Sequence, residues 1–154
     1  MKSLIVCVAG VMVVSVVLDY GSAYAASISL SKRPSNINVL SEGGVGVATL
    51  GIVSSDFPSG KSGGLKKLLG IEWTTTSYPQ NLNEQVKLCY YRPYNTAQQT
   101  CDWIQPNSSG TTFTFNDQKF GNGAGVIIYH NVQGGGARIG YPAGSDSVTF
   151  RYAD

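Results

Sequence analysis

Hydrophobic and polar residues alternate in short stretches along this chain. The alternation is clearest at residues 26–31, 111–115 and 148–152, and Gly, Pro, Asn and Ser clusters separate one stretch from the next. A period of two residues is typical of a strand with one buried face. We find neither a long helical pattern nor an internal repeat. About eight short strands with turns at intervals of roughly ten residues predict an all-β fold, an antiparallel sandwich or barrel.

Within this pattern, several large side chains are predicted to lie in the core. Trp73 shares a predicted strand face with Ile71, and Phe113 and Phe115 share a face of the strand at 111–115. Phe120 follows in a Gly/Asn/Asp loop, and we expect it to turn inward as a plug. Residues 65–69 are compatible either with one helical turn or with the start of the strand that contains Trp73. The last strand, 148–152, is expected to be paired in a sheet.

The stretch from 86 to 104 contains Cys89 and Cys101. Residues 86–91 alternate as one strand, residues 92–95 form an Arg-Pro-Tyr-Asn turn, and residues 101–104 return as a second strand. We predict that a Cys89–Cys101 disulfide closes this pair of strands, provided that the protein resides in an oxidising compartment.

The start of the chain indicates whether the protein reaches an oxidising compartment. Lys2 precedes an uncharged apolar run from 4 to 18, and an Ala-Tyr-Ala pattern ends at Ala25. This order predicts a secretory signal peptide over residues 1–25, with a single β domain at 26–154. The apolar run is shorter than the roughly 20 residues of a membrane-spanning helix. The third cysteine, Cys7, lies in the apolar run and is expected to leave with the signal, so Cys89 and Cys101 remain as a pair.

Charge is sparse and scattered. The full chain has 11 basic and 9 acidic residues, and removal of residues 1–25 would take away Lys2 and Asp19. The remaining chain would then have 10 basic and 8 acidic residues. A nucleic-acid partner held through its phosphates requires clustered Lys and Arg, so we expect none. No later apolar run is long enough to span a membrane once the signal is cleaved.

Catalytic and cofactor chemistry has little support in the sequence. His130, the only histidine, lies in a predicted strand without an acidic neighbour in sequence, so we interpret it as structural or exposed. One histidine and two oxidised cysteines do not make a zinc site. Residues 60–62, Gly-Lys-Ser, lack the first glycine of a phosphate-binding loop, and the glycines at 43–46 precede no helix. Paired carboxylates that meet in space stay an open alternative, but we expect a protein without enzymatic activity or cofactor.

Aromatic residues and arginine gather around the predicted disulfide loop. Such side chains dominate protein interfaces because they combine a large rigid area with a polar group. The alternative is that Tyr90 and Trp103 lie in the core and their neighbours cover it. A glycine turn at 134–136 is either a tight turn or a docking edge. The candidate partner-binding residues are therefore Tyr91, Arg92, Tyr94, Trp103, Gly134, Gly135 and Gly136.

Five short motifs follow one another between Trp73 and Tyr152. They are Val-Lys-Leu-Cys at 86–89, the second cysteine at 101, Ser-Gly-Thr-Thr at 109–112, Val-x-Gly-Gly-Gly at 132–136 and Val-x-Phe-Arg-Tyr at 148–152. In order and spacing the chain resembles the FlhE family of flagellar proteins. The segment 60–67 and the Tyr- and Arg-rich disulfide loop depart from the family pattern.

The resemblance implies an exported protein that stays in the periplasm as a non-enzymatic accessory of flagellar assembly and export, with a flagellar rod or export component as its partner. Two alternatives stay open. One is an exported β-sandwich binding module such as a pilus or adhesin subunit, and the other is a periplasmic enzyme inhibitor that uses the loop at 91–94. An adhesin subunit built for donor-strand exchange would lack one strand of its own sheet.

Overall fold

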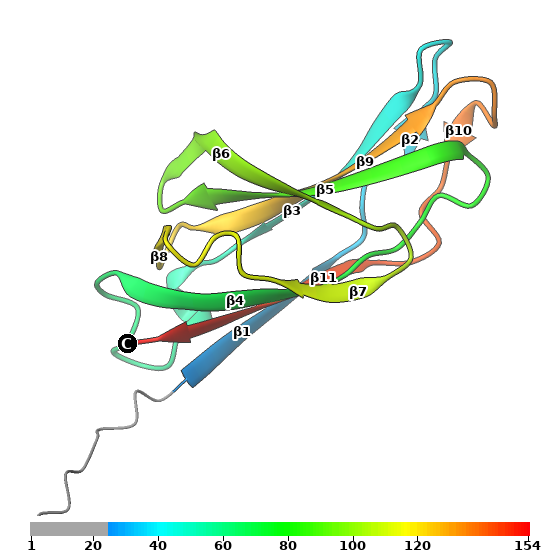
Figure 1. Cartoon of the computed structure of the whole chain (residues 1–154). Coiled ribbons are helices and arrows are strands. Elements are labelled where there is room, and N and C mark those ends of the chain that lie inside the picture. Colours follow the sequence, from blue (N-terminus) through cyan, green and yellow to red (C-terminus); the bar gives the residue numbers. More distant parts are fainter. Residues whose placement is uncertain (1–24) are drawn as a thin grey trace, which may run out of the picture.

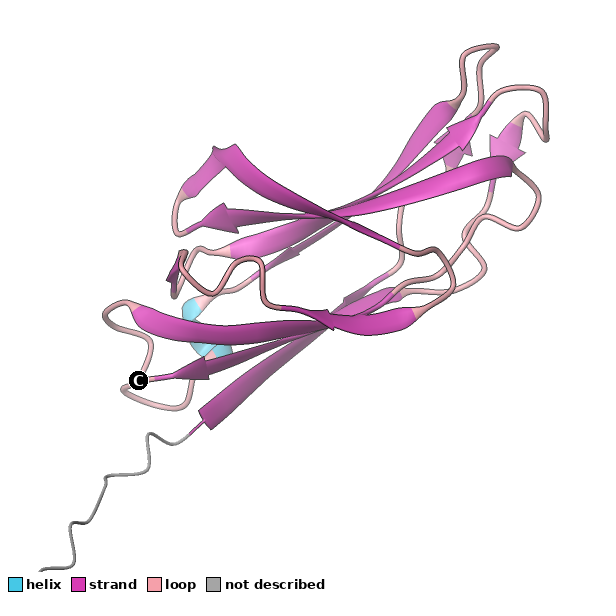
Figure 2. Ribbon diagram, viewed as in Figure 1, coloured by secondary structure: helices cyan, strands magenta, loops and turns pink. Residues whose placement is uncertain are grey.

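The computed structural model describes residues 25–154, which form two curled antiparallel sheets packed face to face (Figures 1 and 2). The predicted signal peptide, with Cys7, lies outside the described residues except for Ala25, the first residue of β1. The strands are β1 (Ala25–Lys32), β2 (Ile37–Asn38), β3 (Gly44–Gly51), β4 (Lys66–Thr74), β5 (Leu82–Arg92), β6 (Asn95–Ile104), β7 (Ser109–Thr112), β8 (Lys119–Phe120), β9 (Gly125–Gln133), β10 (Ile139–Gly140) and β11 (Asp146–Ala153). A 3-10 turn, η1 (Ser54–Asp56), is the one helical element within residues 25–154.

One sheet has the order β1-β11-β4-β7, with β8 added beside β4, and the other has the order β3-β9-β5-β6. The pair β2-β10 stands apart at one end of the sandwich. Eight of these strands have four or more residues, and the other three have two each, so the all-β prediction of about eight strands is confirmed. The C-terminal strand β11 pairs with both β1 and β4, as expected for a terminus held in a sheet.

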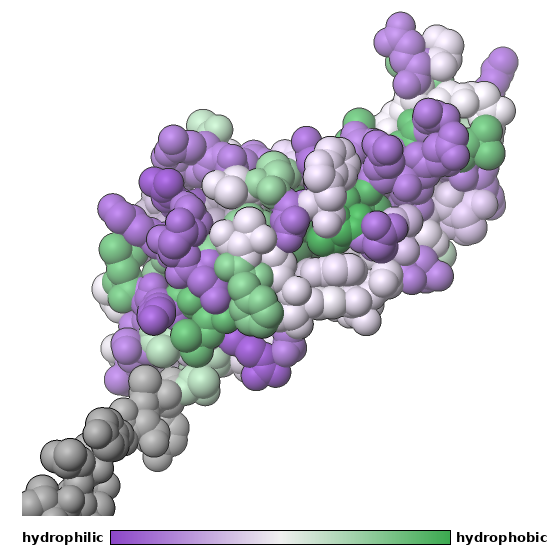
Figure 3. Space-filling model, in the orientation of Figure 1, coloured by the Kyte–Doolittle hydropathy of each residue, from purple (hydrophilic) through white to green (hydrophobic). Residues whose placement is uncertain are grey.

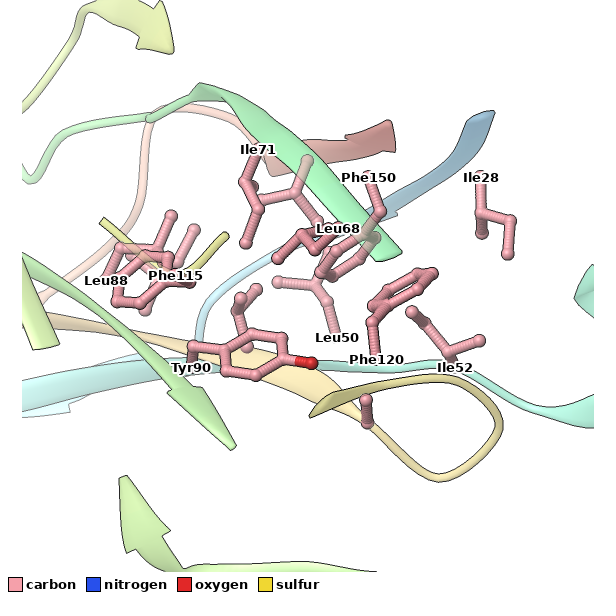
Figure 4. Packing of buried hydrophobic residues seen from close by; sticks show 14 of the residues in the cluster. Ile28, Leu50, Ile52, Leu68, Ile71, Leu88, Tyr90, Phe115, Phe120 and Phe150 are labelled. Atoms are coloured by element: carbon pink, nitrogen blue, oxygen red, sulfur yellow. The ribbon is translucent and has the colours of Figure 1, made fainter. Parts of the chain in front are cut away.

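The core lies between the sheets and consists of the inward residues of alternating strands. Leu68, Phe120 and Phe150 are fully buried there, and the rings of Phe120 and Phe150 lie 5.6 Å apart (Figure 4). Phe120 therefore turns inward as predicted. Tyr90 packs on Phe115 at 5.6 Å between ring centroids, and its hydroxyl donates a hydrogen bond to the carbonyl of Lys119.

Two of the core predictions need correction. Phe113 is 65% exposed because Thr112 is the inward residue at the end of β7, so the next side chain points outward. The alternation breaks only after Phe113, where the strand has ended, and Phe115 returns to the core. Trp73 is only partly buried, against the edge of the core, and its ring lies over Gly110 of the neighbouring strand β7. A side chain at Gly110 would overlap that ring, so the glycine makes room for the tryptophan. The segment 65–69 joins β4 from Lys66 onward and is not a helical turn.

The predicted disulfide between Cys89 and Cys101 is present. The two residues are direct cross-strand partners in β5 and β6, with 4.0 Å between their Cα atoms. Cys89 is completely buried while its neighbours Leu88 and Tyr90 face the core on the opposite side of the strand. The disulfide thus lies on the outer face of its sheet and links the edge strand β6 to the sheet interior.

Candidate functional site

The outer face of the β3-β9-β5-β6 sheet is almost free of charge. Its central row runs across four strands from Val47 through Tyr129 and Lys87 to Trp103, and the next row ends in the Cys89–Cys101 disulfide. Lys87 is the one charged residue on this face among the described strands, and its ammonium group lies 5.2 Å from the centre of the Tyr129 ring. Trp103 is 68% exposed. We call this surface, with its residues on β3, β5, β6 and β9, the outer face.

The alternation of the strands explains why these side chains gather. Inward neighbours such as Val86, Leu88 and Ile128 fill the core, so Lys87 and Tyr129 must point outward. Tyr129 donates a hydrogen bond from its hydroxyl to the side-chain oxygen of Gln99, 3.3 Å away. The rigid sheet and the disulfide hold the exposed Trp103 beside this pair.

The structure separates the candidate residues into three places. Tyr91 and Trp103 lie on the outer face, but Tyr91 is only 5% exposed. Its hydroxyl end lies against Gly51 and Gly125, where a Cβ atom would overlap it. Burial raises the pKa of the Tyr91 hydroxyl. Tyr91 thus helps to shape the surface while Trp103 offers open area. The interpretation of Trp103 as a core residue is wrong, because its position in β6 points away from the core, whereas Tyr90 is a core residue.

Arg92 and Tyr94 lie beyond the outer face, at the turn between β5 and β6. Arg92 is half-buried and donates from Nε to the side chain of Gln118 at 2.9 Å. Tyr94 is 80% exposed, has a φ of 57°, and accepts a hydrogen bond from Asn122 at 2.7 Å. Next to it lies a cleft of about 490 Å³, whose lining residues are Ser62, Gly63, Gly64, Leu65, Pro93, Tyr94, Gly121 and Asn122.

The glycine turn lies at the opposite end of the sandwich, after β9 (Figure 1). Gly134 packs against the backbone of Ser41, and Gly136 approaches Asn81. Gly135 has a φ of 91°, which is accessible mainly to glycine. Gly134, Gly135 and Gly136 are thus a tight turn, remote from Trp103 and Tyr94.

Sequence reasoning missed a buried charge cluster around His130. The imidazole Nδ1 lies 2.6 Å from Glu84 and Nε2 lies 2.9 Å from Asp146. His130 and Asp146 are inaccessible to solvent, and the Glu84 side chain is 8% exposed. The ring of Tyr78 lies 5.3 Å from the imidazole.

The other carboxylate oxygens bind the backbone that links the two sheets. Glu84 accepts from the amide of Tyr78 and Asp146 from the amide of Thr76, each at 2.9 Å. Glu84 reaches His130 because β5 bulges at Asn83 and Glu84, where its register against β9 shifts. These contacts join β5 and β9 of one sheet to β11 of the other.

Burial opposes protonation of the imidazole, but the hydrogen bonds to Asp146 and Glu84 raise the pKa of His130 to about 9. At neutral pH the ring is therefore a cation that donates to both carboxylates. Burial and the two carboxylates also raise the pKa of the Tyr78 hydroxyl, which donates to the carbonyl of Ser35 at 2.5 Å. Because both ring nitrogens are engaged, His130 has no free nitrogen with which to accept a proton from a substrate or to bind a metal.

The topology, not local spacing, creates this cluster. Glu84 and Asp146 are 46 and 16 residues from His130 along the chain. A single histidine at an inward position of a buried strand was the available signal, since a buried histidine requires hydrogen-bond partners. Across residues 25–154 we find no group of three or more His, Cys, Asp or Glu side chains arranged to hold a metal ion. That part of the chain also contains no helix with the length and hydrophobicity of a membrane span.

Neither a protein-family model nor a curated protein matches the sequence. Among solved structures, the crystal structure of FlhE superposes with a TM-score of 0.55 over 84% of this chain and 98% of the FlhE chain, at 15% sequence identity. Such an identity supports a shared arrangement of strands and no more. The chain therefore has the fold of FlhE, the fold that its C-terminal motifs predicted.

Proposed function

We propose that this chain is a non-enzymatic periplasmic accessory protein of the flagellar assembly and export system, and that it binds a flagellar rod or export component through the outer face. The observation that carries the proposal is the exposed Trp103 on a rigid and nearly uncharged sheet. The FlhE fold supports the flagellar context, and so does the resemblance of the five short motifs between Trp73 and Tyr152 to that family. The disulfide supports an oxidising location such as the periplasm.

The composition of the outer face favours a protein partner. Tryptophan and tyrosine supply contact area that loses little conformational entropy on binding, and Lys87 over Tyr129 adds a polar group. In the view of Figure 3, hydrophobic residues form separate patches among hydrophilic ones. The described residues also complete both sheets and enclose their core, with β1 paired along its full length. Because no strand is missing from either sheet of the described residues, an accessory protein is favoured over a pilus-type subunit whose sheet is completed by a strand from another subunit.

The test is affinity capture from a periplasmic extract with the tagged mature protein, followed by mass spectrometry. We expect rod or export components to be retained, and Trp103→Ala to reduce their recovery because it removes the largest exposed side chain of the outer face. Tyr141→Ala is the matched control, since Tyr141 is 49% exposed near β10 at the opposite end. Equal recovery with both variants would contradict the assigned surface.

The identity of the captured protein tests the flagellar context. Recovery of an outer-membrane usher would instead support the pilus-type binding module. Recovery of a single hydrolase would support the inhibitor, and its loss in Tyr94→Ala would then place the contact at the exposed turn next to the 490 Å³ cleft.

A further inference from the structure

Strand β6 is an open edge of its sheet. It pairs with β5 on one side, and no other described strand pairs with it (Figure 1). From Gln99 to Ile104 its register against β5 is continuous. An exposed strand edge offers unpaired backbone donors and acceptors to an incoming chain.

The disulfide shows which backbone groups point outward. Directly opposed residues in an antiparallel pair are about 5.5 Å apart when they exchange hydrogen bonds and about 4.5 Å apart when they do not. Cys89 and Cys101, with Cα atoms 4.0 Å apart, belong to the second kind. The backbone N–H and C=O of Cys101 therefore point away from β5. By alternation the same holds for Gln99 and Trp103, and no turn, loop or side-chain hydrogen bond within residues 25–154 involves the backbone of these three.

Of the features that protect edge strands in natural sheets, β6 has an inward-pointing charge at Asp102 but lacks lysine, proline and a short length. Natural sheets blunt their edges with lysine, proline or very short strands. Between Asn95 and Ile104 there is neither lysine nor proline. The edge strand β7 has only four residues. Strand β3 is covered at Val47, whose carbonyl accepts from the Ser35 amide and whose amide donates to the Ser35 hydroxyl. The free edge of β1 ends at Lys32, followed by Arg33 and Pro34.

The side chains of β6 indicate what kind of strand fits. On the outer face an added strand would contact Trp103 and the disulfide, which favours apolar side chains. On the inner face it would pass Asp102, the one charged residue of β6. Asp102 accepts hydrogen bonds from Thr112 and Thr114 through Oδ2, whereas Oδ1 accepts none from the described residues and is not buried. A basic side chain opposite Asp102 would supply the missing donor.

We propose that β6 binds an extended segment of a partner protein as an added antiparallel strand, with apolar residues on the outer face and a basic residue opposite Asp102. This inference deepens the proposed function, because it names how the partner is held. Backbone hydrogen bonds from Gln99, Cys101 and Trp103 would hold the segment, and Asp102 would select its charge.

The test uses the mature protein and a synthetic probe, the capped heptapeptide Val-Thr-Val-Lys-Val-Thr-Val. Its valines match the outer face and its lysine matches Asp102. A second peptide with Glu in place of Lys tests charge. Two N-methylated peptides test the backbone, one methylated on the valine amides that would face β6 and the other on the Thr and Lys amides that would face solvent.

We expect the lysine peptide to bind up to about fivefold more tightly than the Glu peptide, and Asp102→Asn to remove this preference. Methylation of the valine amides should abolish binding while methylation of the other amides does not. Gln99→Pro should weaken binding about fivefold, because it removes one outward donor and leaves the ladder to β5 intact. On binding, the amide hydrogens of Gln99, Cys101 and Trp103 should exchange at least about tenfold more slowly.

Absence of binding to the lysine peptide by folded protein would overturn the inference, as would equal binding of both methylated peptides. Slow exchange of the same three amides in free protein, with a dimer in light scattering, would show that a second copy occupies the edge and would also overturn it. If the Gln99→Pro variant captured a flagellar component as well as the unmodified protein does, strand addition would be overturned while the flagellar context would stand. If the protein bound the peptide but captured no flagellar component, the flagellar context would be contradicted while strand addition would stand.

Discussion

The buried cluster of Glu84, His130 and Asp146 predicts a loss of stability at alkaline pH. In the folded protein the pKa of His130 is raised from 6.5 to about 9. The folded state therefore holds a proton that the unfolded chain releases above pH 6.5 or so. The contribution of this proton is fully present below the unfolded pKa and is lost as the pH rises through about 9.

The size of the effect follows from the same two pKa values. Each unit of difference corresponds to about 1.36 kcal/mol, so a rise from 6.5 to about 9 contributes about 3 kcal/mol to the free energy of unfolding. Between these values the free energy should fall by at most about 1.4 kcal/mol per pH unit, since one proton is involved. This loss is a large share of the roughly 5–15 kcal/mol that stabilises an ordinary domain.

Urea denaturation of the mature protein from pH 6 to pH 10 measures this slope. The imidazole can also be observed alone by NMR, because His130 is the only histidine. His130→Gln is the direct control, in which the pH dependence assigned to the imidazole should vanish. Should that variant fail to fold, Glu84→Gln keeps one carboxylate partner and should lower the pKa of His130. Stability that stays level or increases from pH 7 to 9.5, or an imidazole that titrates below pH 7, would refute the reasoning.

Three further predictions concern stability. Replacing Cys89 and Cys101 together by alanine should lower the free energy of unfolding by about 3 kcal/mol, measured by urea denaturation, because the unfolded chain regains the freedom that the disulfide removes from a loop with a separation of 12 residues. Phe120→Ala should cost about 3–5 kcal/mol in the same assay because it empties the core, whereas Phe113→Ala, at a residue 65% exposed, should cost much less; similar losses would contradict the burial pattern. Gly125→Ala should lower the free energy of unfolding by about 1–3 kcal/mol, and with it the melting temperature, because the added methyl group would overlap the Tyr91 hydroxyl. An unchanged melting temperature would argue against that packing.

Several features were accessible from the sequence because local patterns encode them. Alternation identified β1, β5 and β11, since a period of two places every second residue on the same face. Two cysteines on neighbouring predicted strands identified the Cys89–Cys101 disulfide. The same pattern failed at Phe113, because where a strand ends depends on its partner strand and not on its own residues.

The candidate site was only partly predictable. Tyr91 and Trp103 do share the outer face, but Tyr94 and the turn at Gly135 lie elsewhere. The number of residues between two positions in the sequence does not predict whether they lie at the same end of the sandwich. Burial of Tyr91 depends on Gly51 and Gly125 in two other strands, a contact that no local pattern reveals.

By itself the sequence determined the all-β class, the approximate strands and the disulfide, because these follow from periodicity and from two cysteines. Only the tertiary structure decided that Glu84 and Asp146 meet His130, that Trp103 faces solvent, and that β6 is left as an open edge. The physical reason is that strand order is set by pairing between segments distant in sequence. That order determines which side chains share a buried space and which backbone groups stay unpaired.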